Sequence, residues 1–196
     1  MEVFVESRRR KRENVLKLHP GAEIIDVTSN SDSEFRQLSP FFPIGNIPVP
    51  GMEGEKALCV EGVWQGLKVF ENYNYDKSYF KISTKNIKRT FRKFGIVKGH
   101  FYKGELLSYV DARKKIYLPA YKYVLDGKMK DLVDKLRVIA KNKTLVLLDY
   151  TTNDSILNYR KPLSHAAVIK AAILQDYSIL EKEVEIKKES KQGKLF

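Results

Sequence analysis

The sequence predicts a single α+β domain that is mostly helical and encloses a small buried sheet. Several segments repeat apolar residues at helical spacing. One continuous apolar run, Leu145–Leu148, is bounded by polar residues, which is typical of a strand buried on both faces. The chain has 196 residues, of which 43% are hydrophobic, and this suffices for one domain with a packed core.

The N-terminal part is expected to form a basic arm or a first helix, followed by a strand. Residues 1–20 contain the basic run Arg8–Arg12, and apolar residues follow it closely. The run is therefore either part of a loose arm or the polar face of a helix. Beyond it, the short β-branched run Glu23–Ser29 predicts a buried strand.

A proline-rich segment, residues 39–53, comes next. Its four prolines exclude a helix and a central strand. Phe42 and its apolar neighbours make the segment too apolar for an ordinary solvated loop. We therefore expect it to pack on the core or to line a pocket, with a simple surface loop as the alternative.

Apolar periodicity predicts helices near Val60 and over residues 84–94, 106–125 and 129–140. Pro119 is expected to end or kink the third of them. After the strand, Ser164 is placed to cap a last helix, which is apolar on all sides and therefore buried. The tail from Glu181 is highly charged and is expected to be frayed.

A formal net charge of +12 favours anionic partners, such as nucleic acid, nucleotides or phosphorylated metabolites. Residues 81–98 carry seven lysines and arginines, Arg89 and Arg92 among them, and no acidic residue. A basic helix in this range would follow a phosphate backbone. The alternative is a solvated cationic face.

The composition argues against a metal centre, a cofactor and a membrane segment. One cysteine and three histidines without ligand-like spacing make a metal site improbable. The apolar runs are far shorter than the ~20 residues that a membrane span needs. No secretory signal is recognised, so we expect a cytoplasmic protein that needs no cofactor and has no membrane partner.

One edge of the helix expected near Val60 carries side chains suited to an anionic sugar or nucleotide. Glu61, Gln65 and Lys68 recur at helical spacing, and Trp64 lies one turn from Glu61. A carboxylate can activate water or stabilise an oxocarbenium-like centre, a lysine can hold a phosphate, and an indole can stack on a base. The alternative is a solvated face with a core tryptophan.

The loop that follows the strand Leu145–Leu148 is a second candidate site. It runs from Asp149 to Asp154 and includes Asn153. Loops at the carboxyl ends of strands often bind ligands, but Asn and Asp are also ordinary turn residues. His165, at the start of the last helix, is either a local hydrogen-bonding partner or a substrate-binding residue.

Four segments resemble motifs of the NADAR superfamily, and they occur in the same order. Ser39–Pro43 is similar to the family's S-x-F-[YF]-P, and Cys59–Lys68 is similar to its S-V-E-x-x-[FYW]-Q-x-x-K. Leu147–Ile156 is similar to its L-[VL]-E-A-S-P-x-D-x-[IF]-W-G, and Leu163–Lys170 stands where the family has N-x-L-G-x-x-L-M-x-[VL]-R. The likeness covers most of the chain and points to a little-characterised branch of bacteria and phages.

The resemblance implies an N-glycosidase. The family includes enzymes that cleave C–N glycosidic bonds in phosphorylated riboflavin intermediates and enzymes that remove ADP-ribose from modified guanine. Glu61 is implied as the catalytic carboxylate and Asp154 as the second acidic residue. The implied organisation is a basic part at residues 1–20, a catalytic domain at 21–180 and a charged tail at 181–196.

The implied substrate is an ADP-ribosylated compound, with guanine in nucleic acid as one case, or a phosphoribosylated compound. Lys68, Arg89 and Arg92 would hold its phosphates. The other hypothesis is a non-catalytic module that binds a nucleotide or nucleic acid through residues 81–98.

This sequence departs from the family pattern at two points. Leu157 and Asn158 replace a Trp-Gly pair, and Trp64 is the only tryptophan. The enzyme hypothesis also requires that the helix carrying Glu61 faces the loop carrying Asp154.

Overall fold

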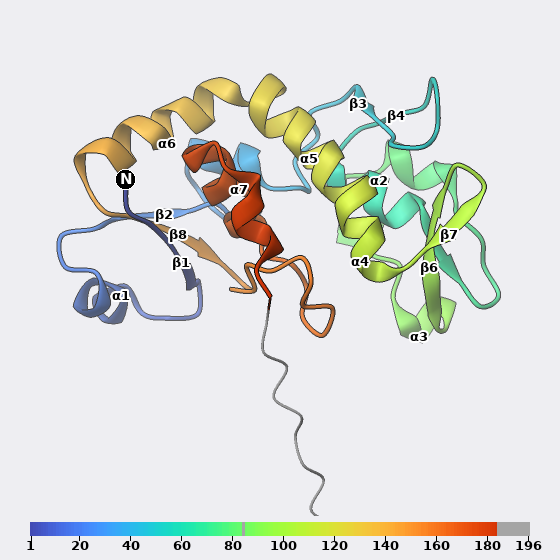
Figure 1. Cartoon of the computed structure of the whole chain (residues 1–196), viewed down its shortest axis with the longest axis horizontal. Helices are drawn as coiled ribbons and strands as arrows, with labels where there is room; N and C mark the ends of the chain where they lie inside the picture. Colours follow the sequence, from blue (N-terminus) through green and yellow to red (C-terminus); the bar gives the residue numbers. More distant parts are fainter. Residues whose placement is uncertain (84, 184–196) are drawn as a thin grey trace, which may run out of the picture.

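Two small sheets lie at opposite ends of the molecule, and a long helical run connects them (Figure 1). The computed structural model describes residues 1–83 and 85–183. One sheet is parallel, with the order β1 (Val3–Ser7), β8 (Leu145–Asp149), β2 (Glu23–Asp26). The other is antiparallel, with the order β5 (Lys68–Phe70), β6 (Val97–Tyr102), β7 (Glu105–Leu107). The protein is therefore an α+β domain, as the sequence predicts.

β8 is the central strand of the parallel sheet, and both of its faces are buried. Leu145 and Leu147 point into the main core, on which α7 (His165–Leu174) packs. Val146 points to the opposite face and packs against α1 (Arg12–Leu18). Burial on both faces explains the continuous apolar run and confirms the predicted strand.

The helical run between the sheets passes a proline without ending. It consists of α4 (Tyr109–Ala112), a π-helical turn (Arg113–Tyr117), α5 (Leu118–Tyr123), a second π-helical turn (Val124–Lys128) and α6 (Lys130–Asn142). Pro119 cannot donate a backbone hydrogen bond, and the wider π-helical turn directly before it accommodates the missing donor. The helix therefore does not end at this proline, which was one of the two predicted outcomes, and the helix predicted over residues 129–140 is confirmed.

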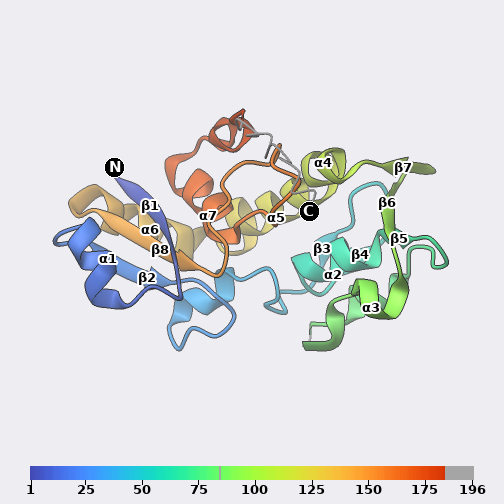
Figure 2. The same cartoon turned by 90° about the horizontal axis from the view of Figure 1, so that it is seen from below.

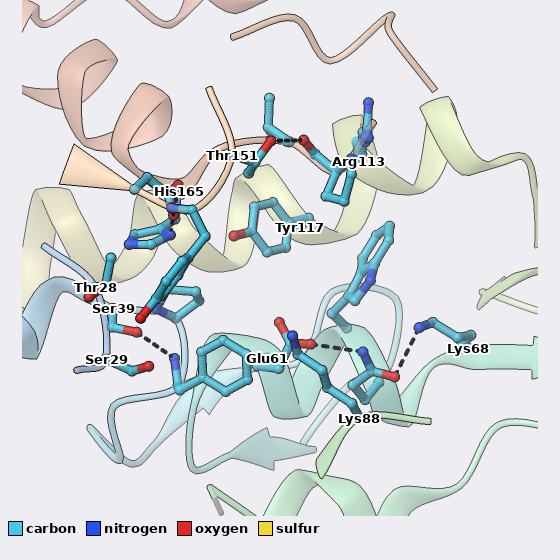
Figure 3. A pocket seen from close by; sticks show the side chains of 18 of the residues that line it. Thr28, Ser29, Ser39, Glu61, Lys68, Lys88, Arg113, Tyr117, Thr151 and His165 are labelled. Atoms are coloured by element: carbon cyan, nitrogen blue, oxygen red, sulfur yellow. Dashed lines mark hydrogen bonds and ion pairs between the residues drawn. The ribbon is translucent and has the colours of Figure 1, made fainter. Parts of the chain in front are cut away.

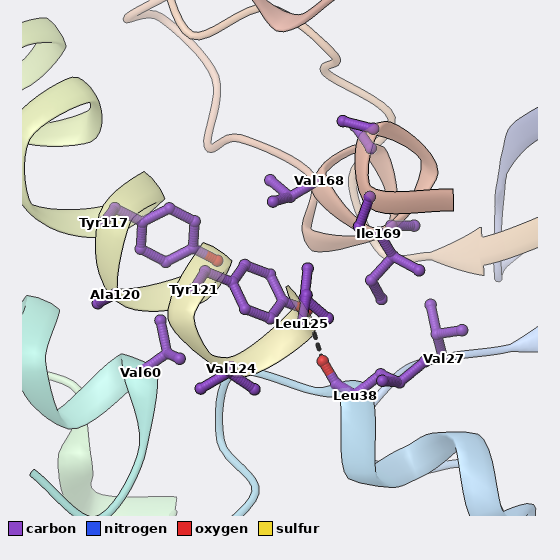
Figure 4. Packing of buried hydrophobic residues seen from close by; sticks show 14 of the residues in the cluster. Val27, Leu38, Val60, Tyr117, Ala120, Tyr121, Val124, Leu125, Val168 and Ile169 are labelled. Atoms are coloured by element: carbon purple, nitrogen blue, oxygen red, sulfur yellow. Dashed lines mark hydrogen bonds between the residues drawn. The ribbon is translucent and has the colours of Figure 1, made fainter. Parts of the chain in front are cut away.

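The core lies where α5 and α7 meet between the two sheets (Figure 2). Figure 4 shows Tyr121 of α5 among these side chains, with its hydroxyl donating to the carbonyl oxygen of Leu38. This bond ties the start of the proline-rich segment to the core. Within that segment, Ile47 and Val49 are buried, and β3 (Ile47–Pro48) pairs with β4 (Lys56–Ala57). The segment therefore packs on the core, as expected.

The N-terminus contains a strand that the sequence analysis missed. β1 pairs with β8 along its whole length, and Val3 is buried. The helix of this region, α1, begins at Arg12, so most of the basic run Arg8–Arg12 lies in the turn before it. A five-residue strand with one fully buried side chain leaves little alternation for a sequence pattern to reveal.

The helix predicted over residues 84–94 is wrong, and so is the basic helix over residues 81–98. The region forms a single 3₁₀ turn (Lys85–Ile87), the four-residue helix α3 (Phe91–Phe94) and the start of β6. Gly95, at φ 80°, ends α3 in a conformation that glycine adopts readily. Ile87 is buried as predicted, but Phe91 is 68% exposed.

The helix predicted over residues 106–125 starts later, because residues 105–107 form β7. The tail predicted to fray from Glu181 lies outside the described residues from position 184 onward. No helix in the described part of the chain is long and apolar enough to cross a membrane.

Because β1 completes the parallel sheet, removal of residues 1–7 should destabilise the whole domain. We expect the melting temperature to fall by about 10 °C or more, since loss of several kcal/mol shifts a domain of this size by that amount. Circular dichroism during heating measures the change. Arg9→Ala, which removes an exposed charge and keeps β1, is the control. Equal melting of the truncated and full chains would contradict this role of β1.

Candidate functional site

A cavity of about 530 Å³ lies where the carboxyl ends of β2 and β8 face α2 (Val60–Gly66) (Figure 3). Its volume is within the range of ~300–1,000 Å³ that is usual for small-molecule sites. Crevices at the carboxyl ends of parallel strands commonly hold ligands. The proline-rich segment, the loop before α3, α4 with its π-helical turn and the start of α7 complete the wall.

Two glycines allow α2 to pack closely against Tyr79 and Phe80. The opposite face of the helix is thereby directed into the cavity. A Cβ atom at Gly66 would lie 2.3 Å from Cε1 of Phe80, and one at Gly62 would lie 2.9 Å from the carbonyl oxygen of Tyr79. Cys59 caps the helix, because its Sγ accepts from the amide of Gly62 at 3.2 Å. Burial raises the pKa of this thiol to about 11, so it acts as a structural group.

Glu61, Gln65 and Lys68 form one hydrogen-bonded chain along this wall. Nε2 of Gln65 donates to Oε1 of Glu61 at 2.8 Å, and Nζ of Lys68 donates to Oε1 of Gln65 at 2.9 Å. The backbone amide of Arg89 donates to the same Gln65 oxygen at 3.0 Å. The structure thus brings the three predicted residues together, although Lys68 belongs to β5 because α2 ends at Gly66.

Lys68 is held in an environment that weakens its charge. Burial lowers the pKa of its ammonium group to about 8, and the charge of Arg89 adds to this, whereas the carboxylate of Glu61 opposes it. A bound anion would restore the preference for the charged form. Lys68 is therefore protonated in most molecules at neutral pH and loses its charge just above it.

Trp64 belongs to an aromatic wall beside Glu61. Its ring meets those of Tyr109 and Tyr117 edge to face, each at 5.6 Å between centroids. Behind it, His100 stacks at 3.8 Å, and burial lowers the pKa of this imidazole to about 3. Burial, together with the charge of Glu61, raises the pKa of Tyr117 well above its ordinary value, so its phenol stays neutral.

The opposite wall contains a buried carboxylate, Asp149, which the sequence analysis placed at the start of the candidate loop without giving it a role. Its Oδ2 accepts from Nδ1 of His165 at 3.0 Å and from the hydroxyl of Ser164 at 2.7 Å. Burial alone would raise the pKa of Asp149, but the hydrogen bond and charge of His165, with help from Ser164, hold it below its ordinary value. Nε2 of His165 faces the carbonyl oxygen of Val27 at 3.0 Å. His165 therefore lines the cavity with both ring nitrogens engaged.

Asp154 and Asn153 do not line this cavity. Asp154 is exposed, lies 3.8 Å from Nζ of Lys182, and borders a separate cavity. Asn153 is buried, and its side chain donates to carbonyl oxygens of the loop between Ser155 and Pro162. The requirement that Glu61 and Asp154 share a pocket wall is not met, because the chain turns away from the cavity after Thr151.

Phe42 and Arg92 also lie outside the cavity, where Phe41 and Lys88 take their places. Phe41 and Lys88 both line the wall, with Nζ of Lys88 5.3 Å from the Phe41 ring centroid. Arg92 is exposed on α3. Arg89 lies before α3, so it shares no helical face with Arg92.

Arg89 lines the cavity, but its guanidinium group is already committed to the protein. The terminal nitrogens donate to the carbonyl oxygens of Lys68 at 2.6 Å, Asn74 at 2.9 Å and Gln65 at 3.3 Å. The rings of Phe70, Tyr79 and Phe94 surround it. Arg89 therefore holds the elements around Lys68 in place, and the predicted role as a phosphate clamp does not fit its terminal nitrogens.

Several lining residues were missed because no local pattern marks them. Tyr117 and Arg113 stand on a π-helical turn, and Thr28 and Ser29 follow β2. Arg113 lies over the Tyr109 ring and donates to carbonyl oxygens of Ile156, Asn158 and Lys161. The one available signal was that β2 and β8, as parallel neighbours, end at the same edge.

Fold and site together define an α+β domain with a buried glutamate in a cavity at the carboxyl ends of parallel strands. The chain belongs to a family of unknown function, DUF6939, whose model matches residues 7–169. The matched range includes every residue that lines the cavity. No curated protein and no solved structure matches the chain.

Arg89→Met should destabilise the fold, because it removes a buried guanidinium group that donates to the carbonyl oxygens of Gln65, Lys68 and Asn74. We expect a loss of about 2–5 kcal/mol in the free energy of unfolding, measured by urea titration. Arg92→Met, on the exposed face of α3, should change it by less than ~0.5 kcal/mol. Equal losses for the two variants would show that Arg89 has no special structural role.

Proposed function

We propose that the protein hydrolyses the N-glycosidic bond of a phosphorylated riboside, with Glu61 as the catalytic carboxylate. The observation that carries the proposal is the setting of Glu61. It is 8% exposed, is held by Gln65, and lines a cavity of about 530 Å³. In the described part of the chain it forms no salt bridge, so the carboxylate is not neutralised by a bonded cation.

The proposed reaction uses only groups of the cavity and water. Glu61 accepts a proton as the oxygen of a water molecule attacks the anomeric carbon. The C–N bond breaks, its electron pair stays with the nitrogen of the base, and that nitrogen takes up a proton from solvent. The negative charge of Glu61 also stabilises the oxocarbenium-like character of the transition state.

The other walls suit the remaining parts of such a substrate. Lys68 and Lys88 provide positive charge for a phosphate at one end. Trp64 and Phe41 provide flat apolar surface beside Glu61. The resemblance of Cys59–Lys68 to the NADAR signature helix supports the same chemistry. Asp154 has no part in the proposal, because it lies outside the cavity.

Glu61→Gln should lower kcat by about 10²–10⁴-fold, the usual contribution of a general base. The substrates to test are ADP-ribosylated guanosine, ADP-ribosylated single-stranded DNA, NAD and phosphorylated pyrimidine ribosides, with released base and sugar followed by mass spectrometry. Asp154→Asn is the matched control and should retain activity. Loss of activity in Asp154→Asn with activity retained in Glu61→Gln would overturn the assignment.

The second candidate is a module that binds a nucleotide or nucleic acid without turnover. The observation that favours it is the exposed face around α3. Phe91 is 68% exposed there beside Arg92 and Lys93, and neither cation forms a salt bridge within the described residues. Binding of the same compounds by the wild-type protein, with no release from any of them, would favour this module over the hydrolase.

The affinity of the cavity for a phosphorylated ribose should fall as the pH rises through the pKa of Lys68. Because this pKa is lowered to about 8, the ammonium form predominates at pH 7 and is scarce at pH 9. The affinity for ribose 5-phosphate should therefore fall about tenfold between these pH values, as measured by isothermal titration calorimetry. In Lys68→Met this pH dependence should vanish. An unchanged dependence in the variant would assign it to another group.

A further inference from the structure

Buried polar atoms without a hydrogen-bond partner occur in two residues that line the cavity and in one that lies behind Trp64. In the described part of the chain there are four of them: Oγ1 of Thr28, Nε of Arg89 and both ring nitrogens of His100. Thr28 and Arg89 line the cavity, and His100 stacks on Trp64, which also lines it. Such atoms are costly to leave unpaired, so a ligand that pairs with one of the two lining residues would offset part of this cost.

Thr28 is the free hydroxyl at the sheet end of the cavity. It is 1% exposed, and its backbone amide donates to Oδ1 of Asp26 at 2.8 Å, which fixes its position after β2. Two neighbouring polar side chains, those of His165 and Tyr150, are already engaged. His165 contacts Asp149 and Val27, as described above, and Oη of Tyr150 accepts from Asn30 at 2.8 Å. The hydroxyl of Thr28 thus has no partner among the described residues, and a polar ligand group that reaches it would satisfy it.

The two ends of the cavity differ in charge. The lining residues that follow β2 and β8 or precede α7 include no lysine or arginine among those described, and the carboxylate of Asp149 there is already engaged by His165 and Ser164. At the other end, Lys68 and Lys88 carry positive charge. Figure 3 shows Glu61 between Thr28 and Lys68. A ligand that fills the cavity would be anionic at one end and uncharged at the other.

We propose that the Thr28 end is a second subsite, which binds the uncharged base of a phosphorylated riboside through the Thr28 hydroxyl. This inference rests on the proposed function, because it takes the sugar to lie at Glu61 and the phosphate at Lys68 and Lys88. A hydroxyl both donates and accepts, so it can pair with either a carbonyl or an amino group of a base. In this arrangement Thr28 binds the base, which is the group that leaves when the N-glycosidic bond is broken.

Thr28→Val tests the subsite, because it removes the hydroxyl and nearly preserves the shape of the side chain. Binding is measured by isothermal titration calorimetry in a Glu61→Gln background, which prevents turnover. The probes are ribose 5-phosphate, which lacks a base, and the 5′-monophosphates of guanosine, adenosine, cytidine and uridine. We expect the preferred nucleotide to lose about tenfold in affinity, the value of one hydrogen bond, with ribose 5-phosphate unchanged.

The melting temperature of the free protein separates this role from a structural one. Because the hydroxyl is buried and unpaired, the melting temperature of Thr28→Val should be equal to or higher than that of the protein with Thr28. Thr144→Val removes a hydroxyl that donates to Glu2 at 2.9 Å outside the cavity, and it should not change nucleotide affinity.

The inference would be overturned by any of three results. The first is that the protein with Thr28 binds none of the four nucleotides more tightly than ribose 5-phosphate. The second is that Thr28→Val leaves the affinity for the nucleotides unchanged. The third is a lower melting temperature in Thr28→Val. The hydrolysis assay tests the proposed function separately, since a base-dependent loss of affinity can occur whether or not the wild-type protein turns the compound over.

Discussion

The side-chain amide of Gln65 joins three parts of the chain that differ in structure and lie apart in sequence. It donates to Glu61 one turn earlier in α2, and its oxygen accepts both from Lys68 at the start of β5 and from the backbone amide of Arg89. The orientation of the amide is therefore determined, because only the nitrogen can donate to a carboxylate. Loss of this group would release the carboxylate, the ammonium group and the loop before α3 together.

Two of the 36 lysines and arginines are buried and serve the interior of the protein. Arg89 and Arg113 are each at most 4% exposed, and both donate to backbone carbonyl oxygens of irregular segments. These segments have no sheet or helix to pair their carbonyl groups, so a buried guanidinium group replaces the missing donors. The net charge of +12 accordingly overstates the charge available to anionic partners. Lys68, by contrast, is engaged only by a side chain and can still turn to a ligand.

The periodicity of apolar residues was sufficient to predict an element where those residues share one environment, namely the buried core. β8, α6 and the capped helix α7 were predictable because their apolar residues are all buried or repeat on one face. The region around Arg89 was not, because a buried arginine looks like part of a solvated face. The choice of Asp154 over Asp149 failed for a related reason. Asp149 ends β8 and retains the inward direction of a strand residue, whereas Asp154 lies beyond the point where the loop leaves the cavity.

The same features that stabilise the cavity also prevent it from satisfying all of its own polar groups. Aromatic rings around Trp64 bury His100 without offering a hydrogen-bond acceptor or donor. His165 is engaged by Asp149 and Val27 and so leaves Thr28 unpaired. A fold selected only for stability would replace such groups with apolar ones of similar shape, since that exchange is often neutral or favourable. The presence of the Thr28 hydroxyl in the wall of the cavity is therefore what the proposed ligand would explain.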